Sequence, residues 1–240
     1  MSGIYLSLVF PAYNEELRLP RSLEKTVAYL KRQSYSSEII VVDDGSSDRT
    51  ADGARSVLDP SGIPFKVISL DTNRGKGFAV KTGMEAAAGE YVFFSDSDLS
   101  TPIEELERLL PLLEKEYDVA IGSRGMKESK LEVRQPFLRE YGGRSLNLLV
   151  QLIAMPGIKD TQCGFKGFRA AAAKQITSRQ KLSGYSFDVE ILYIARKLGM
   201  KITEVPITWR NDPATKVSAV REGIKIVIDS FRIRKEHDKQ

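Results

Sequence analysis

The sequence predicts one α/β domain whose mostly parallel β-sheet is flanked by helices and followed by a C-terminal amphipathic helical segment. Three observations favour this fold class. Short apolar runs alternate with stretches of helical character. The runs are continuously apolar, which is typical of strands covered on both faces. Polar clusters follow the ends of several runs, and open α/β sheets bind ligands beyond the carboxyl ends of their strands.

Five apolar segments are expected to form strands. They are Leu6–Phe10, Glu38–Asp43, Phe65–Ser69, Tyr91–Ser95 and Val119–Gly122. Helices are expected between them. Leu17–Lys31 has leucines and a valine at helical spacing, Gly77–Ala88 is rich in good helix formers, and Ile103–Glu116 follows a Thr-Pro pair with acids in its first turn.

The second half of the chain has a looser pattern. After a basic segment that reaches Arg144, we expect an apolar helix within Leu146–Ile158, a glycine-rich stretch DTQCGFKGF, a helix at Phe187–Leu198 and a strand at Lys201–Trp209. We interpret this half, residues 126–215, as the side of the domain that binds the acceptor of a reaction.

Composition excludes several kinds of site. The single cysteine cannot form an intrachain disulfide, and one histidine is too few for a Cys/His zinc site, so a metal would need oxygen ligands. We find neither a secretory signal nor the roughly 18 uninterrupted apolar residues of a membrane span, and therefore expect a cytoplasmic protein. The net charge of +4 suits any polyanion, but no nucleic-acid-binding motif is present.

An acidic cluster, VVDDGSSD, ends the second expected strand. The carboxylates of Asp43 and Asp44 are placed to accept hydrogen bonds from a nucleotide base or ribose. The alternative is structural, because Ser47 or Asp48 can cap the following helix.

A second acidic cluster, Asp96-Ser97-Asp98, ends the fourth expected strand. Mg²⁺ and Mn²⁺ prefer oxygen ligands and are often bound by one or two carboxylates plus substrate phosphates. The cluster therefore predicts a metal site, with Asp98 and Asp96 as ligands. The alternative is again a turn, in which Asp98 or Ser100 caps the next helix.

Two basic features suit phosphate groups. NRGKG at Asn73–Gly77 combines a flexible turn, positive charge and a helix N-terminus, although it is no Walker loop. A longer basic stretch is either a solvated surface or a second phosphate site. It comprises Arg124, Lys127, Lys130, Arg134, Arg139 and Arg144.

Taken together, these motifs resemble a known family. PAYNE at Pro11–Glu15, VVDDGSSD, NRGKG and SDSD look like the motifs of family 2 glycosyltransferases, which have the Rossmann-like GT-A fold. The resemblance covers nearly the whole chain. GSR at Gly122–Arg124, DTQCGFKGF and FDVEILY are similar to dolichyl-phosphate β-glucosyltransferases and their prokaryotic polyprenyl-phosphate relatives.

The resemblance implies roles for individual residues. The donor nucleotide sugar would contact Pro11, Ala12, Tyr13, Glu15, Asp43, Asp44, Lys76, Asp96, Ser97 and Asp98, with Asp98 as the principal metal ligand. The acceptor phosphate would contact Arg124, Arg139 and Arg144. The related mannosyltransferases have a glutamine and a serine where this chain has Ser100 and Gly143, so specificity for mannose is in doubt.

The implied reaction is metal-assisted, inverting transfer of glucose from UDP-glucose to a polyprenyl or dolichyl phosphate, with Mg²⁺ or Mn²⁺, at the cytoplasmic face of a membrane. A phosphate monoester with a second pKa of about 6 is mostly a dianion at neutral pH and needs no strong base. If the acceptor were a sugar hydroxyl, Asp160 would be the candidate base. The alternatives are GDP-mannose as donor, a soluble or glycan acceptor, and a nucleotide-sugar-binding protein without turnover.

We expect a single domain in which residues 1–125 bind the nucleotide sugar and residues 216–240 form a basic amphipathic segment. That segment has seven basic residues against four acidic ones, with apolar residues at helical spacing. It would either lie on an anionic membrane surface or pack its apolar stripe on the core.

Overall fold

The computed structural model describes residues 3–133, 149–210 and 219–238. Within these ranges, strands form a seven-stranded sheet in the order β3-β2-β1-β4-β7-β5-β8 and a two-stranded sheet of β6 and β9. The strands are β1 (Leu6–Ala12), β2 (Ser37–Asp43), β3 (Phe65–Ser69), β4 (Tyr91–Ser95), β5 (Val119–Ser123), β6 (Lys130–Val133), β7 (Phe165–Arg169), β8 (Ile202–Pro206) and β9 (Thr208–Arg210). All five predicted strands of the first half are present.

The sheet is parallel except at β7, which runs antiparallel to both β4 and β5. This strand comes from the DTQCGFKGF stretch, so a piece of the second half is inserted between two strands of the first half. The single strand predicted at Lys201–Trp209 is wrong in extent. It is divided into β8, which completes the large sheet, and β9, which pairs with β6.

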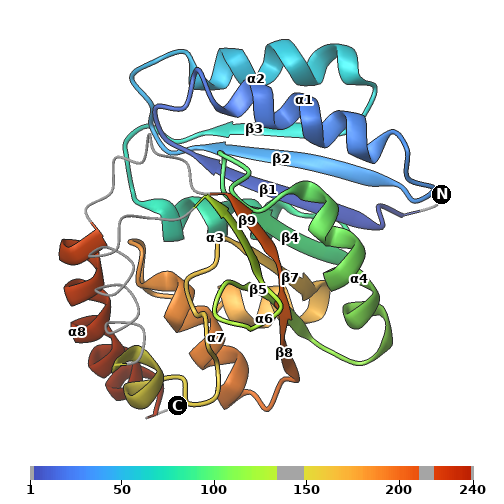
Figure 1. The fold of residues 1–240 in the computed structure, drawn as a ribbon. Coiled ribbons are helices and arrows are strands. Elements are labelled where there is room, and N and C mark those ends of the chain that lie inside the picture. The colour runs from blue at the N-terminus through green and yellow to red at the C-terminus, as the bar shows by residue number, and fades with distance from the viewer. Residues whose placement is uncertain (1–2, 134–148, 211–218, 239–240) are drawn as a thin grey trace.

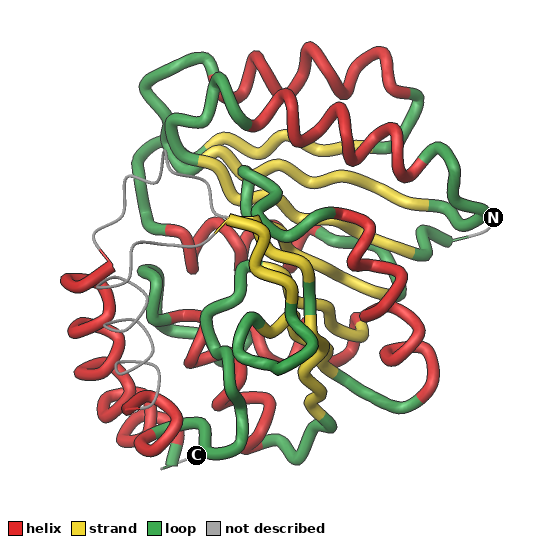
Figure 2. Tube along the Cα trace, viewed as in Figure 1, coloured by secondary structure: helices red, strands yellow, loops and turns green. Residues whose placement is uncertain are grey.

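Helices cover both faces of the sheet (Figures 1 and 2). They are α1 (Leu19–Leu30), α2 (Thr50–Leu58), α3 (Lys76–Ala86), α4 (Leu106–Lys115), α6 (Ala170–Thr177), α7 (Phe187–Lys197) and α8 (Ala219–His237). Residues 149–153 are also helical. No helix in the described ranges is long and apolar enough to cross a membrane.

Each face of the sheet has its own hydrophobic core. Leu8 and Phe10 of β1 pack with α1, α2 and α4, whereas Val9 between them packs with α3, α6, α7 and α8. All seven residues of β1 and of β2 are buried, as the continuous apolar runs predict for strands covered on both faces.

The topology brings the predicted polar clusters to one edge of the sheet. β1, β2 and β4 are parallel neighbours, so the residues that follow Ala12, Asp43 and Ser95 emerge together. Because β7 is antiparallel, it begins where these strands end. The residues just before Phe165 therefore lie beside the SDSD cluster.

Candidate active site

The centre of this edge is an ion pair between a lysine and the first carboxylate of SDSD. Lys76 Nζ, at the start of α3, lies 2.6 Å from Asp96 Oδ1. That oxygen is shielded from solvent and accepts no hydrogen bond of normal geometry from a described residue. Burial alone would lower the pKa of Lys76, but the charges of Asp96 and Asp188 raise it above its usual value. Lys76 is thus a fixed cation at the end of β4.

The second carboxylate, Asp98, lies in a tight turn. Its Oδ1 accepts the backbone N–H of Ser100 at 2.8 Å, so the turn that the sequence offered as an alternative is present. Leu99 has a φ of 48°, in the left-handed region. Burial, reinforced by the negative charge of Asp96, raises the pKa of Asp98 above its usual range. Two carboxylates that repel each other in a partly buried site favour a bound cation.

A glycine of the DTQCGFKGF stretch leaves room for Asp96. The Asp96 backbone N–H donates to the Gly164 carbonyl at 3.1 Å. A Cβ on Gly164 would lie only 2.0 Å from Asp96 Oδ2, so a side chain there would displace the carboxylate.

The two carboxylates fit a divalent cation that completes its coordination with other oxygen ligands. In the described part of the chain, no group of three or more Asp, Glu, His or Cys side chains could hold a metal. Mg²⁺ commonly binds through one or two carboxylates and substrate phosphates, which matches this donor set.

A second, more deeply buried ion pair lies near the pair of Lys76 and Asp96. Lys166 of β7 and Asp188 of α7 are almost fully buried and in direct contact. Lys166 Nζ also donates to the Cys163 carbonyl at 2.7 Å. Burial raises the pKa of Asp188, while the positive charges of Lys166 and Lys76 oppose that shift. Breaking a buried pair is strongly destabilising, so this pair supports the loop before β7.

The two aspartates at the start of the VVDDGSSD loop, Asp43 and Asp44, accept hydrogen bonds from backbone N–H groups of nearby loops. Asp43 Oδ1 accepts the N–H of Ser46 at 3.0 Å. Asp44 is 3% exposed, and its two oxygens accept the N–H groups of Arg74 and Gly75, each at 2.8 Å. Asp44 therefore positions the NRGKG turn that precedes Lys76.

The residues of PAYNE differ in exposure. Pro11 and Ala12 are buried at the end of β1, whereas Tyr13 is 46% exposed and available to a ligand. Glu15 accepts a hydrogen bond from Arg18 Nε at 2.6 Å. Asn14, at a φ of 55°, accepts the N–H of Ser47 and joins this loop to the VVDDGSSD loop.

Arg124 and Asp160 form a close, oriented pair. Asp160 accepts hydrogen bonds from Arg124 Nε at 2.7 Å, Nη2 at 2.9 Å and the backbone N–H at 2.9 Å. Burial alone would raise the pKa of Asp160, but the Arg124 guanidinium holds it below its usual range. The guanidinium also lies 5.5 Å from the ring centre of Trp209. Arg139 and Arg144 lie outside the described residues.

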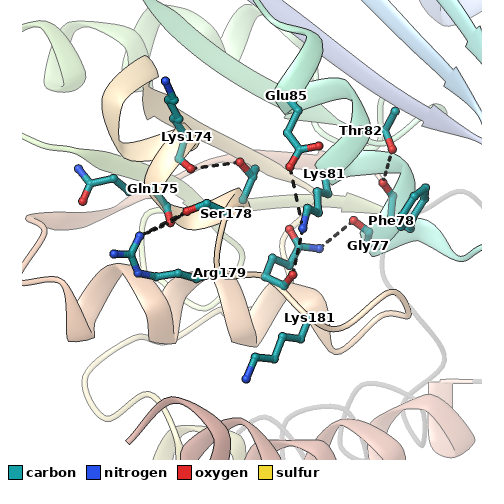
Figure 3. A network of polar contacts seen from close by, with 12 residues as sticks. Gly77, Phe78, Lys81, Thr82, Glu85, Lys174, Gln175, Ser178, Arg179 and Lys181 are labelled. Carbon is teal, nitrogen blue, oxygen red and sulfur yellow. Dashed lines mark hydrogen bonds and ion pairs between the residues drawn. The ribbon is translucent and has the colours of Figure 1, made fainter. Parts of the chain in front are cut away.

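The loop after α6 packs on the NRGKG turn. Gln180 donates its side-chain amide to the Gly77 carbonyl at 2.8 Å, and Lys81 donates to the Gln180 carbonyl at 3.2 Å. Figure 3 shows Gly77 and Lys81 of α3 facing this loop. The Phe78 N–H donates to the Ser183 carbonyl at 3.2 Å. The position of Lys76 thus depends on residues about a hundred positions later in the chain.

Sequence reasoning missed several residues of this site: Asn14, Gly164, Lys166, Asp188 and Tyr185, whose ring centre lies 5.8 Å from Lys76 Nζ. Four of them lie in the motifs PAYNE, DTQCGFKGF and FDVEILY, so the signal was present. What was missing was the antiparallel β7 that brings these motifs to the SDSD cluster.

Comparisons with known proteins identify the family of the chain. A family model described as glycosyl transferase family 2 matches residues 7–177. The chain is 36% identical to the dolichyl-phosphate beta-glucosyltransferase of Dictyostelium discoideum, over 98% of this chain and 75% of that protein. The identity is 35% to the Homo sapiens protein of the same name, over 95% and 74%, and 33% to that of Saccharomyces cerevisiae, over 96% and 74%.

Solved structures show the same fold. Glucosyl-3-phosphoglycerate synthase from Mycobacterium tuberculosis matches with a TM-score of 0.68 at 21% identity, over 95% of this chain and 81% of that one. The same protein in complex with Mn²⁺, UDP-glucose and phosphoglyceric acid matches with a TM-score of 0.68 at 22% identity, over 95% and 80%. The predicted fold class is confirmed.

Proposed function

Because the chain belongs to glycosyl transferase family 2, and is therefore a glycosyltransferase, we propose that it transfers glucose from UDP-glucose to a polyprenyl or dolichyl phosphate with inversion. The observation that supports this most is the charge arrangement at one edge of the sheet. Two carboxylates suited to a divalent cation lie close to Lys76. Arg124 directly follows β5, which is separated from β4 by β7 in the sheet. Such a site can hold a diphosphate donor and a phosphate acceptor together.

The donor would bind where the loops after β1 and β2 meet α3. Tyr13 offers an exposed ring, and Pro11, Ala12 and Glu15 would contact the donor beside it. Asp43, Asp44 and Ser97 would complete the donor site, and Lys76 would attract the diphosphate because its charge is held in place.

Asp96 and Asp98 would hold Mg²⁺ or Mn²⁺. When bound, the cation would neutralise the charge that develops on the leaving nucleoside diphosphate. Without it, the two carboxylates would repel that diphosphate, so binding and transfer would both fall. The role of Lys76 is to oppose part of this repulsion.

Arg124 would orient the acceptor phosphate. Asp160 uses Nε, Nη2 and the backbone N–H of Arg124, which leaves Nη1 to donate to an anion. We infer that Asp160 positions Arg124 rather than acting as a base, because its oxygens are engaged and its pKa is lowered. The dianionic phosphate supplies its own nucleophilic oxygen. Arg139 and Arg144 are proposed as further contacts.

A lipid acceptor places the reaction at a membrane surface, and we propose a peripheral location at the cytoplasmic face. In this proposal residues 1–125 bind the donor and residues 126–215 the acceptor, within one domain. Nucleic acid is not an expected partner.

The deciding experiment is transfer of radiolabelled sugar to a short polyprenyl phosphate. UDP-glucose and GDP-mannose are compared as donors, with Mn²⁺, with Mg²⁺ and with a chelator. A glucosyl-lipid that requires metal supports the proposal. A mannosyl-lipid instead would overturn the donor, and metal-dependent donor hydrolysis without any lipid product would overturn the acceptor.

Asp98→Asn tests the proposed metal site by changing one side chain. Because it keeps the shape but removes a charge from the proposed metal site, we expect transfer to fall by about a hundredfold or more with little change in thermal stability. Asp52→Asn, on the exposed surface of α2, is the control and should retain full activity. Full activity in Asp98→Asn would show that Asp98 is not a ligand of a required metal ion.

A further inference from the structure

We propose that the outward face of α8 is a docking surface for an anionic lipid bilayer. The helix lies at the edge of the molecule (Figure 1). The proposal deepens the proposed function, since a lipid acceptor must be reached at a membrane, but it is argued from the surface of this helix alone.

One face of α8 packs against the core of the protein. Gly223, Ile226, Ser230, Ile233 and His237 are buried and are separated by alternating steps of three and four residues, which places them on one side of the helix. His237 Nε2 lies 2.9 Å from Glu190 Oε1 of α7. The expectation that an apolar stripe of this segment packs on the core is therefore correct for this face.

The opposite face is apolar as well, and it is exposed. Ile224, Ile228 and Phe231 are 51%, 63% and 61% exposed. Their i, i+4, i+7 spacing places them in one row, and at about 100° per residue that row lies opposite Ile226 and Ile233. Removing large apolar side chains from water is favourable, so the row is a contact surface that the fold itself leaves unused.

The charges around the row select the partner. Among the side chains of α8 that the structure describes, the exposed positions contain five basic residues and no acid, and the exposed Asp238 follows the helix directly. The basic residues are Arg221, Lys225, Arg232, Arg234 and Lys235. The other acids are partly buried, and Asp229 and Glu236 are engaged with Ser186 and with Arg232 and Lys181. A basic, apolar helix face complements anionic lipid, whereas a second copy with the same charge would be repelled.

The same helix borders the candidate active site. Lys225 Nζ lies 3.6 Å from where a Cβ of Gly184 would be, and Asp229 bonds Ser186. Between these contacts is Tyr185, next to Lys76. A bilayer against the outer face of α8 would therefore lie one loop away from the residues proposed to bind the donor diphosphate.

The test is binding of the full chain to phosphatidylcholine vesicles with and without phosphatidylglycerol, measured by co-sedimentation. We expect binding only to the anionic vesicles, and the double variant Ile228→Glu/Phe231→Glu should weaken it by about tenfold or more. Leu17→Glu, which changes a leucine before α1 that is even more exposed, should leave it unchanged. Lys235→Glu should weaken binding to anionic vesicles and make it less sensitive to salt.

Three outcomes would overturn the proposal: equal binding by wild type and double variant, loss of binding in Leu17→Glu to the same degree, or a wild-type dimer that the double variant abolishes. Thermal unfolding and transfer to a water-soluble, short-chain acceptor check that the double variant is folded and active. If vesicle binding behaves as expected but no acceptor is glucosylated, the docking surface stands and the proposed function fails.

Discussion

At the scale of single residues, Asp96 depends on a neighbour that has no side chain. Gly164 accepts the Asp96 backbone N–H through its carbonyl and leaves room for the Asp96 carboxylate, because a Cβ there would lie 2.0 Å from Asp96 Oδ2. The backbone of Gly164 is not in the left-handed region, so the requirement for glycine is steric and not conformational.

We expect Gly164→Ala to move the Asp96 carboxylate and to lower kcat/KM for the donor by about tenfold or more, with a higher metal concentration needed for half-maximal activity. Steady-state kinetics over a Mn²⁺ titration measure both effects. Gly184→Ala is the control, because its new Cβ would be 3.6 Å from the nearest atom, an ordinary contact. An unchanged metal requirement in Gly164→Ala would contradict this steric role.

The pair of Asp160 and Arg124 makes a prediction about pH. The pKa of Asp160 is lowered in the folded protein, so the pair stabilises the fold above the usual carboxyl value of 3.8, and this contribution is lost as pH falls through the folded pKa. Asp160→Asn should lower the free energy of unfolding at neutral pH by about 3 kcal/mol, since it leaves Arg124 without its partner.

Urea unfolding between about pH 7 and pH 3 tests this, with Asp71→Asn on the exposed surface as the control. The difference between wild type and Asp160→Asn should shrink at the acidic end of the range. A difference that stays constant across the range would mean that the stabilisation does not come from the ionised carboxylate.

At the scale of elements, α3 is packed closely on the sheet through a glycine. A Cβ on Gly83 would lie 2.3 Å from Val9 Cγ1 of β1. In an isolated helix, replacing glycine by alanine is favourable by about 1 kcal/mol. Here the alanine would overpack the core, which typically costs about 1–3 kcal/mol, and this cost should exceed the gain in helix propensity.

Gly83→Ala should therefore destabilise the protein, and Val9→Ala in the same chain should recover part of the loss because it removes the methyl groups in contact. A double-mutant cycle measured by urea unfolding gives the coupling, for which we expect about 1 kcal/mol or more. Strictly additive effects of the two changes would show that α3 shifts to accommodate the alanine.

The elements also show where sequence patterns are sufficient. The parallel strands β1, β2, β4 and β5 are apolar and buried on both faces, so their pattern is strong, whereas β3 at the edge of the sheet is only partly buried. β7 contains Lys166 and Gly167, and its sequence therefore does not resemble a buried strand. Lys166 is tolerated because Asp188 pairs with it, and Gly167 is needed because the ring of Phe93 occupies the space of its Cβ. Both reasons are tertiary contacts.

At the scale of the whole molecule, the single cysteine reports on the integrity of the core. Cys163 is 1% exposed, and burial raises the pKa of its thiol to about 11. Since the thiolate is the reactive form, a thiol reagent should not label the native protein at about pH 8, and labelling should follow urea unfolding. Comparison with free cysteine under the same conditions gives the protection. Rapid labelling of the native chain would mean that the loop before β7 opens without global unfolding.

The sequence by itself determined the fold class, the positions of the first five strands along the chain and the acidic and basic motifs, because these follow from local periodicity and from residue types at strand ends. Only the tertiary structure decided which of these residues work together. Asp44 holds the turn before Lys76, Asp160 holds Arg124, and α8 packs on one face while a second apolar face stays exposed. Each of these depends on contacts between segments far apart in the chain, which local patterns do not record.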